Sequence, residues 1–385
     1  MVASDNQART PRDLGRDVSA LNGIRGLAIL QVVLAHTHYL VNSDPQAVYM
    51  TNSWFVNRIF EPGYLGLDLF FVLSGFLISS LLLRDLADRS EGSGKRTTVL
   101  RYFYARRALR LLPALYVMLA LDWVFVLISG DVSLHTQWRT TYSAAFYIAN
   151  WATVWNLPAT NPDLGHLWSL AVEEQFYIVW PLVILGLTVL VKNRSVKLLA
   201  IITAIVIIAA RRIDLYQGGA NWLFVYIRTD TRIDSMLVGA AFAIIYRYFS
   251  IRTAVTSLLA SAGLIGIIYY KFASPPSDLF EIGFTRTAVF AGLGVLGAAS
   301  GGWVFNRVLQ WRPLVSLGKY SYGLYLYHHV IFLGIGRHMS QYPQSFRLFL
   351  GYGASALCTF LSWRLVESKC LRLKTRFESS HANTG

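Results

Sequence analysis

Arg25 and His36 lie in the same strongly apolar segment, where an ionisable side chain is costly and a functional role is expected. Their separation of 11 residues is close to three helical turns. Both side chains therefore project from nearly the same helix face, about 16 Å apart along the axis. An imidazole can act as a general base, and a guanidinium matches phosphate oxygens. Their position on one helix face favours a functional role over the alternatives, which are a membrane anchor for Arg25 and a hydrogen bond between helices for His36.

Carboxylates occur at a similar depth in two other apolar segments. Asp68 lies in GYLGLDLFFVLSGF, and Glu173 and Glu174 lie in HLWSLAVEEQFYIVW. We expect His36, Asp68 and one of the glutamates to share one layer, because adjacent residues of a helix point about 100° apart. A carboxylate beside an imidazole fixes its tautomer and raises its basicity. The alternative is that these groups only join neighbouring helices by hydrogen bonds.

A second group of candidates is basic. Arg107 and Arg110 have the spacing that places two side chains on one helix face. Arginine forks bind phosphate in a bidentate way, so this pair indicates a site for a phosphorylated cofactor. Anchoring near anionic lipid explains the preceding Arg101 and Arg106 well enough. Arg110 lies deeper, next to two leucines, and is harder to explain in that way.

Three further features are less specific. The charged segment RTDTRIDS contains Arg228, Asp230, Arg232 and Asp234, and is at least as well explained by structural ion pairs as by a substrate site. His328 and His329 are adjacent, which is not the i, i+4 spacing of a chelating pair, although one of them can contact the active layer. The two cysteines lack metal-binding spacing. We therefore expect no metal site.

The composition predicts the structural class. Of the 385 residues, 54% are hydrophobic and 15% are charged, and the mean hydropathy is +0.43. Apolar runs of about 18 residues or more can cross a hydrocarbon core of ~30 Å. We therefore predict an all-α, polytopic integral membrane bundle with about ten spans: Leu21–Val41, Gly63–Arg84, Tyr104–Ser129, His166–Val191, Leu198–Arg212, Thr231–Tyr248, Thr253–Phe272, Phe284–Trp303, Leu317–Arg337 and Phe346–Val366.

The net charge of +14 comes from basic residues clustered between apolar runs. This pattern is typical of cytoplasmic loops beside anionic lipid, so we expect a lipid bilayer rather than nucleic acid as the partner. Every second connection is basic, which places both termini, the tail 1–20 and the basic tail 367–385, in the cytoplasm. The segment Tyr142–Trp155 is too short and polar for a span, and we expect it to be re-entrant or interfacial on the outer side.

Six motifs in this order resemble the acyltransferase-3 family of bacterial membrane enzymes, which O-acylate cell-surface glycans and some secreted metabolites. The resemblance covers Leu21 to about Lys369, and the membrane domain is expected over 21–366. The motifs are LNGIRGLAILQVVLAH, GYLGLDLFFVLSGFLIS, RYFYARRALRLLPALY, HLWSLAVEEQFY, RTDTRIDSMLVG and LGKYSYGLYLYHH. In that family the Arg-x10-His pair is essential and the RxxR motif is donor-related, which corresponds to Arg25, His36, Arg107 and Arg110.

The resemblance implies an enzyme of the bacterial inner membrane that transfers an acyl group from acyl-CoA, most simply acetyl-CoA. The acceptor is expected to be a hydroxyl of a surface or exported glycan, or of a secreted small molecule such as a macrolide. Many members continue into a periplasmic hydrolase-like domain. Here the sequence ends after a basic tail. We therefore expect transfer to be completed alone or by a separate periplasmic partner.

The predicted mechanism joins the two groups of residues. The phosphates of acyl-CoA bind Arg25, Arg107 and Arg110, and the thioester lies beside His36, which Glu173 or Asp68 orients as a general base. An oxyanion stabiliser is also required, for which Tyr177, Tyr322 and Tyr325 are the candidates. A transporter or flippase is the rival class. Transporters often show repeated halves with broken helices at matching positions, and the sequence shows neither.

Overall fold

The protein is described from a computed structural model, which covers residues 14, 19–41, 63–91, 96–155, 161–273 and 278–373. Within these ranges the regular structure is helical, and no strand occurs. The helices and helical turns are α1 Ser19–Ala35, α2 His38–Val41, α4 Gly63–Glu91, α5 Arg96–Ser129, α6 Leu134–Ala145, α7 Ala149–Val154, η1 Pro162–Leu164, α8 Leu167–Leu190, α9 Arg194–Gln217, α10 Trp222–Ile227, α11 Thr229–Arg232, α12 Asp234–Tyr248, α13 Thr253–Ala273, η2 Leu279–Gly283, α14 Phe284–Ser300, α15 Asn306–Leu309, α16 Arg312–Lys319, α17 Ser321–His338, α18 Gln344–Ser362, η3 Trp363–Glu367 and α19 Ser368–Leu373.

The predicted all-helical membrane bundle is confirmed, whereas the count of about ten spans is not. Six helical segments are long and apolar enough to cross a membrane: Ser19–Val41, Gly63–Asp88, Arg96–Ser129, Leu167–Leu190, Thr253–Ala273 and Leu279–Ser300. Large apolar side chains remain exposed on the outside of the bundle, including Ile207 at 62%, Leu258 at 71% and Phe349 at 78%. A surface of this kind fits contact with lipid better than contact with water.

The other four predicted spans correspond to α9, α12, α17 and α18, which do not meet the same test of length and hydropathy. The shortest is α12, whose 15 residues extend about 22 Å, less than the ~30 Å of a hydrocarbon core. It begins only after the chain has passed through two short helices, α10 and α11. The charged segment RTDTRIDS therefore belongs to an interrupted stretch, made of the short helix α11 and the first residues of α12, rather than to the start of a long span.

Asparagine side chains mark the starts of several helical segments. Asn193 caps α9 by accepting a hydrogen bond from the backbone N–H of Ser195 at 2.8 Å. Asn221 caps α10 in the same way, through the N–H of Leu223 at 2.9 Å. A side-chain oxygen at this position satisfies an N–H group that has no partner inside the helix. The short connections are therefore specified locally by the sequence.

Glycines bring the central helices into backbone contact, as small residues commonly do between membrane helices. A Cβ on Gly23 of α1 would lie 1.8 Å from the carbonyl oxygen of Leu309 in α15. A Cβ on Gly75 of α4 would lie 1.9 Å from the carbonyl oxygen of Met236 in α12. Helix α1 is thereby held against α15, and α4 against α12. These contacts fix the rotation of α1 and α4, which carry two of the predicted site residues, Arg25 and Asp68.

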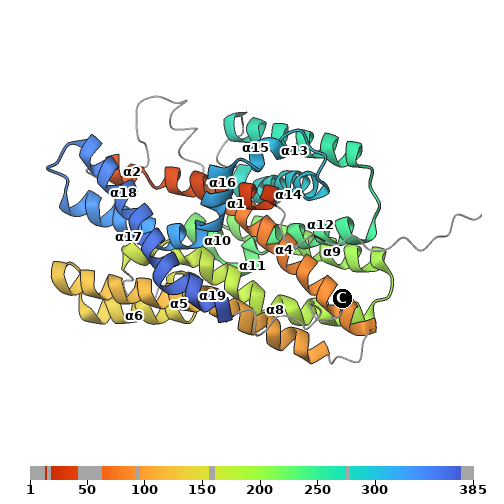
Figure 1. The fold of residues 1–385 in the computed structure, drawn as a ribbon, viewed down its shortest axis with the longest axis horizontal. Helices are drawn as coiled ribbons and strands as arrows, with labels where there is room; N and C mark the ends of the chain where they lie inside the picture. The colour runs from red at the N-terminus through yellow and green to blue at the C-terminus, as the bar shows by residue number, and fades with distance from the viewer. Residues whose placement is uncertain are drawn as a thin grey trace, which may run out of the picture.

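Helices α6 and α7 contain the segment that we expected to be re-entrant or interfacial. Figure 1 shows α6 beside α5 at one edge of the bundle, opposite α13 and α14. Gln175 of α8 donates to the carbonyl oxygen of Tyr147 at 2.7 Å and to Oδ1 of Asn150 at 3.0 Å, and accepts from Nε1 of Trp151 at 3.2 Å. Gln175 lies eight residues into α8, about 12 Å from its first residue. The described end of this segment therefore packs against α8 well beyond the start of that helix.

Candidate active site

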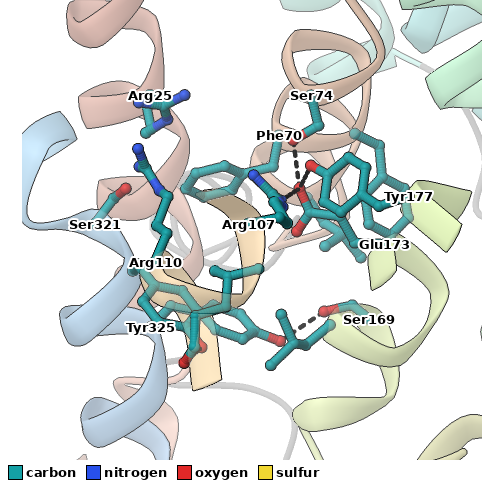
Figure 2. A pocket seen from close by; sticks show the side chains of 15 residues that line it. Arg25, Phe70, Ser74, Arg107, Arg110, Ser169, Glu173, Tyr177, Ser321 and Tyr325 are labelled. Carbon is teal, nitrogen blue, oxygen red and sulfur yellow. Dashed lines mark hydrogen bonds and ion pairs between the residues drawn. The ribbon is translucent and has the colours of Figure 1, made fainter. Parts of the chain in front are cut away.

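One pocket is lined by side chains from five helices, α1, α4, α5, α8 and α17 (Figure 2). Its lining residues are Arg25, Leu67, Phe70, Phe71, Ser74, Arg107, Arg110, Leu111, Ser169, Leu170, Glu173, Tyr177, Ser321, Tyr322 and Tyr325. Three predicted phosphate-binding arginines and one predicted catalytic carboxylate therefore meet in a single site. The rest of the lining is largely aromatic, aliphatic and hydroxyl-bearing.

Arg107 is held in place by opposite charges. Its NH2 lies 3.4 Å from Glu174 Oε1 and 3.7 Å from Glu173 Oε1. Its guanidinium carbon lies 3.6 Å from the centre of the Tyr177 ring, in a cation–π contact. Ser74 and Tyr177 also donate hydrogen bonds to Glu173. Because its charge is already compensated, Arg107 is better placed to organise the pocket than to supply a free cation.

Arg25 and Arg110 have a different environment. In the described part of the chain, neither forms an ion pair with an aspartate or glutamate, and the side chain of Arg25 is hydrogen-bonded to Asn22 at 3.3 Å. The two positive charges are close enough to repel each other, and Figure 2 shows both guanidinium groups at the same end of the pocket. Two like charges that face a shared pocket are candidates to bind an anion.

Tyr325 connects this pocket to a group of histidines. Its hydroxyl donates to the carbonyl oxygen of His166 at 2.5 Å and shares a 2.6 Å hydrogen bond with Ser169. Its ring centre lies 5.2 Å from that of His166 and 6.0 Å from that of His328. The far end of the arginine pocket and the histidine group are therefore directly adjacent.

His36 lies in that group, in the turn between α1 and α2. Its Nδ1 lies 2.9 Å from Nε2 of His328, and its ring centre lies 4.9 Å from that of His329, edge-on. The ring of His166 is stacked on that of His329, with centres 4.5 Å apart. We call His36, His38, His166, His328 and His329 the histidine cluster. In the ranges that the structure covers, no group of three or more histidine, cysteine or acidic side chains is arranged to hold a metal ion.

Helices α1 and α17 run in the same direction between the two parts of the site. Helix α1 carries Arg25 at the pocket and leads to His36, and α17 carries Ser321 at the pocket and leads to His328. The separation along α17 is seven residues, about 10 Å, against about 16 Å between Arg25 and His36. An extended molecule bound by the arginines could therefore follow these helices to the imidazoles.

The predicted layer of His36, Asp68 and Glu173 does not form. Within the described residues, no hydrogen bond or ion pair joins His36 to either carboxylate. Asp68 Oδ1 lies 2.6 Å from the guanidinium of Arg232, and its carboxylate also accepts hydrogen bonds from Ser235 and Thr287 at 3.1 Å each. The side chain of Asp68 is 1% exposed. Instead of orienting an imidazole, Asp68 joins α4 to α12 and α14.

The remaining charged residues of RTDTRIDS also form ion pairs. Asp234 pairs with Arg212 of α9 at 2.8 Å, and both side chains are fully buried. Arg228 pairs with Asp230 at 2.6 Å near the surface. Of the two interpretations given to this segment, the structural one agrees with these contacts.

His166 and Ser74 belong to the site but were not among the predicted residues. His166 is 5% exposed, and neither of its ring nitrogens has a hydrogen-bond partner within the described residues. It precedes Glu173 by seven residues, nearly two whole helical turns, so a shared face could have been inferred from the spacing. Ser74 had no comparable signal, because an isolated serine in an apolar helix is common.

Comparison with known proteins identifies acyltransferases as the relatives of this chain. The chain matches the profile of an acyltransferase domain, that of the acyltransferase-3 family, over residues 18–364. It is 31% identical over 334 residues to a putative peptidoglycan O-acetyltransferase, YrhL, of Bacillus subtilis, covering 82% of this chain and 49% of that protein. It is 28% identical to the peptidoglycan O-acetyltransferase OatA of Listeria monocytogenes and 29% identical to the O-acetyltransferase OatA of Staphylococcus aureus, covering 94% and 92% of this chain.

The chain spans about half the length of these relatives, 57% in the case of both OatA proteins. No solved structure matches significantly. The profile match extends over nearly the whole sequence and includes all the residues of the pocket and of the histidine cluster. The chain therefore belongs to the acyltransferase-3 family.

Proposed function

We propose that this protein is a membrane-embedded O-acetyltransferase, which moves an acetyl group from acetyl-CoA on the cytoplasmic side to a hydroxyl of a cell-wall glycan. The names of its relatives support an O-acetyl product and, for two of them, peptidoglycan as the acceptor. The observation that carries the proposal is the pair Arg25 and Arg110, two guanidinium groups that form no ion pair with a carboxylate and face one pocket in the described bundle.

Coenzyme A suits this pocket because its nucleotide end carries several phosphates and is joined to a long pantetheine arm. In the proposed complex, Arg25 and Arg110 bind phosphate oxygens, while Arg107, compensated by Glu173 and Glu174, holds the adjacent wall in place. The arm extends along α1 and α17 past Tyr325. The thioester then lies at the histidine cluster, about 16 Å from Arg25.

The acceptor hydroxyl reaches the cluster from the other side of the membrane. His36 takes the proton of the hydroxyl as its oxygen attacks the thioester carbonyl carbon, forming a tetrahedral intermediate. The intermediate collapses, the C–S bond breaks, and the thiolate of coenzyme A receives the proton from His36. The products are an acetyl ester and free coenzyme A. The oxyanion requires a hydrogen-bond donor; Tyr325 lies beside the histidine cluster and could supply one if its hydroxyl were released from the carbonyl oxygen of His166.

The proposal is tested with the purified protein in proteoliposomes, supplied with acetyl-CoA labelled with ¹³C in the acetyl group and with muropeptides. Mass spectrometry should detect labelled O-acetyl ester on the glycan and an equal amount of released coenzyme A. Hydrolysis of acetyl-CoA without ester formation would contradict the glycan acceptor. An absence of both reactions, in a preparation that is folded and binds coenzyme A, would contradict an acetyltransferase.

A further inference from the structure

His36 has a specific hydrogen-bond partner, and that partner is not a carboxylate. Five of the eight histidines of the chain lie in the histidine cluster. Within the described residues, one hydrogen bond joins two of these rings, between Nδ1 of His36 and Nε2 of His328 at 2.9 Å. The direction of this bond decides which nitrogen of His36 can take a proton.

The hydrogen bond made by the other nitrogen of His328 shows which ring donates and which accepts. Nδ1 of His328 lies 2.8 Å from the carbonyl oxygen of Leu324, one helical turn earlier. A carbonyl oxygen can only accept a hydrogen bond, so Nδ1 of His328 carries a proton. In a neutral imidazole the second nitrogen is then an acceptor. Nε2 of His328 must therefore accept the hydrogen bond from Nδ1–H of His36.

The neutral form of His328 follows from its surroundings. The side chain is fully buried, and its ring neighbours are His36, His166, His329, Tyr325 and Phe332. No carboxylate is paired with it in the described ranges. A buried positive charge without an anionic partner is costly. A charged His328 would also donate to His36, which would leave His36 with its proton on the wrong nitrogen for a base.

We propose that His328 is a positioning residue, which holds His36 in the tautomer with the proton on Nδ1 and leaves Nε2 free to accept the proton of the acceptor hydroxyl. This inference rests on the proposed acetyl transfer. Within the described residues, Nε2 of His36 makes no hydrogen bond of its own. The relay from Leu324 through His328 to His36 thus does what a carboxylate does in many catalytic imidazole pairs.

The adjacent histidines have different tasks in this arrangement. Nδ1 of His329 lies 2.9 Å from the carbonyl oxygen of Asp163, so its proton is used to join α17 to η1. His38, which also neighbours His36, directs its own Nδ1 to the carbonyl oxygen of Ala35 at 2.7 Å. Neither is hydrogen-bonded to His36 in the described residues. His38 therefore offers a matched control, as a nearby imidazole outside the relay.

The test compares His328→Gln with His328→Met in the proteoliposome assay. The two side chains have nearly the same shape, but the amide oxygen of glutamine is a good acceptor for Nδ1–H of His36, whereas the thioether sulfur of methionine is a weak one. The Met variant should lose roughly 10–100-fold in kcat, the usual effect of removing an orienting partner. KM for acetyl-CoA should not change, since the arginine pocket is intact. The Gln variant should recover most of the loss, and His38→Leu should lose less than His328→Met.

A Met variant with wild-type kcat, or a Gln variant as slow as a folded Met variant, would overturn the inference. If the Met variant does not fold, His328→Leu replaces it and the same outcomes apply. A failure of the proposed function is recognised separately, because the wild-type protein would then form no labelled ester. Wild-type transfer that depends on His36 but not on His328 would contradict this inference alone.

Discussion

Replacing Arg110 with glutamine should weaken the binding of coenzyme A without harming the fold. Arg110 forms no ion pair within 4 Å in the described structure and repels Arg25, and Glu367 and Glu173 attract it only from a longer distance, so its charge contributes little to the fold of the free protein. The free energy that Arg110 contributes should therefore appear almost entirely in the binding of coenzyme A. A hydrogen bond to a charged group is worth about 1.5–3 kcal/mol. At 1.4 kcal/mol per decade, Arg110→Gln should raise Kd about 10- to 100-fold.

Arg106→Gln is the matched control, because Arg106 lies on the same helix but pairs with Asp85 at 3.0 Å and does not line the pocket. Isothermal titration of coenzyme A into detergent-solubilised protein gives the affinities, and 3′-dephospho-coenzyme A reports which phosphate is bound. Arg25→Gln should resemble Arg110→Gln. Arg107 is less suitable, since its removal would leave Glu173 and Glu174 without their cation. Unchanged affinity in both the Arg25 and Arg110 variants would refute the phosphate site.

Three further predictions concern the scaffold. Asp68→Asn should lower the stability of the fold by about 3–5 kcal/mol, because it leaves the buried charge of Arg232 uncompensated. Thermal unfolding in detergent measures this loss, and a variant that is fully stable but inactive would instead support a catalytic role for Asp68. Gly23→Ala should also lower the unfolding temperature, since its Cβ would lie 1.8 Å from the carbonyl oxygen of Leu309, and wild-type stability would show that α1 is not tightly packed there. The basic segment 192–197 at the junction of α8 and α9 is expected on the cytoplasmic side; a single cysteine at Asn193, in a background without native cysteines, should therefore be labelled only after permeabilisation, and labelling in intact cells would reverse this orientation.

Arg25, Arg107 and Arg110 could be identified from the sequence as candidate phosphate ligands because each is a charged residue in an apolar segment, where charge is costly. Helical spacing placed Arg107 and Arg110 on one face, and the distance from Arg25 to His36 is set by the rise of the helix. These are properties of single helices. They do not depend on how neighbouring helices are rotated.

The partners of the carboxylates could not be predicted, because they depend on that rotation. Asp68 shares a helix face with Gly75, seven residues later, and Gly75 is in backbone contact with α12. Asp68 therefore faces Arg232 and not His36. Similarly, Glu173 lies two turns further along α8 than His166, at the level of Arg107. Depth along an apolar segment was thus a poor guide to which charges meet.

The number of spans could not be predicted for a related reason. Apolar length alone does not separate a helix that crosses the membrane from one that starts within the bundle after a break, as α12 does. The break is visible in the charges of RTDTRIDS. However, only packing shows that Arg232 and Asp234 pair with residues of other helices and so allow a polar segment to be buried.

The most direct test of the account is the acetyl-transfer rate of His36→Gln in the proteoliposome assay, measured together with its affinity for coenzyme A. Glutamine has an amide N–H that could donate to His328, but it cannot take a proton from the acceptor hydroxyl. The account predicts a loss of roughly 10²–10⁴ in kcat, the usual contribution of a positioned general base. Coenzyme A affinity should remain at the wild-type value, because the arginines lie about 16 Å away. A folded His36→Gln protein that forms the labelled ester at the wild-type rate would contradict the account.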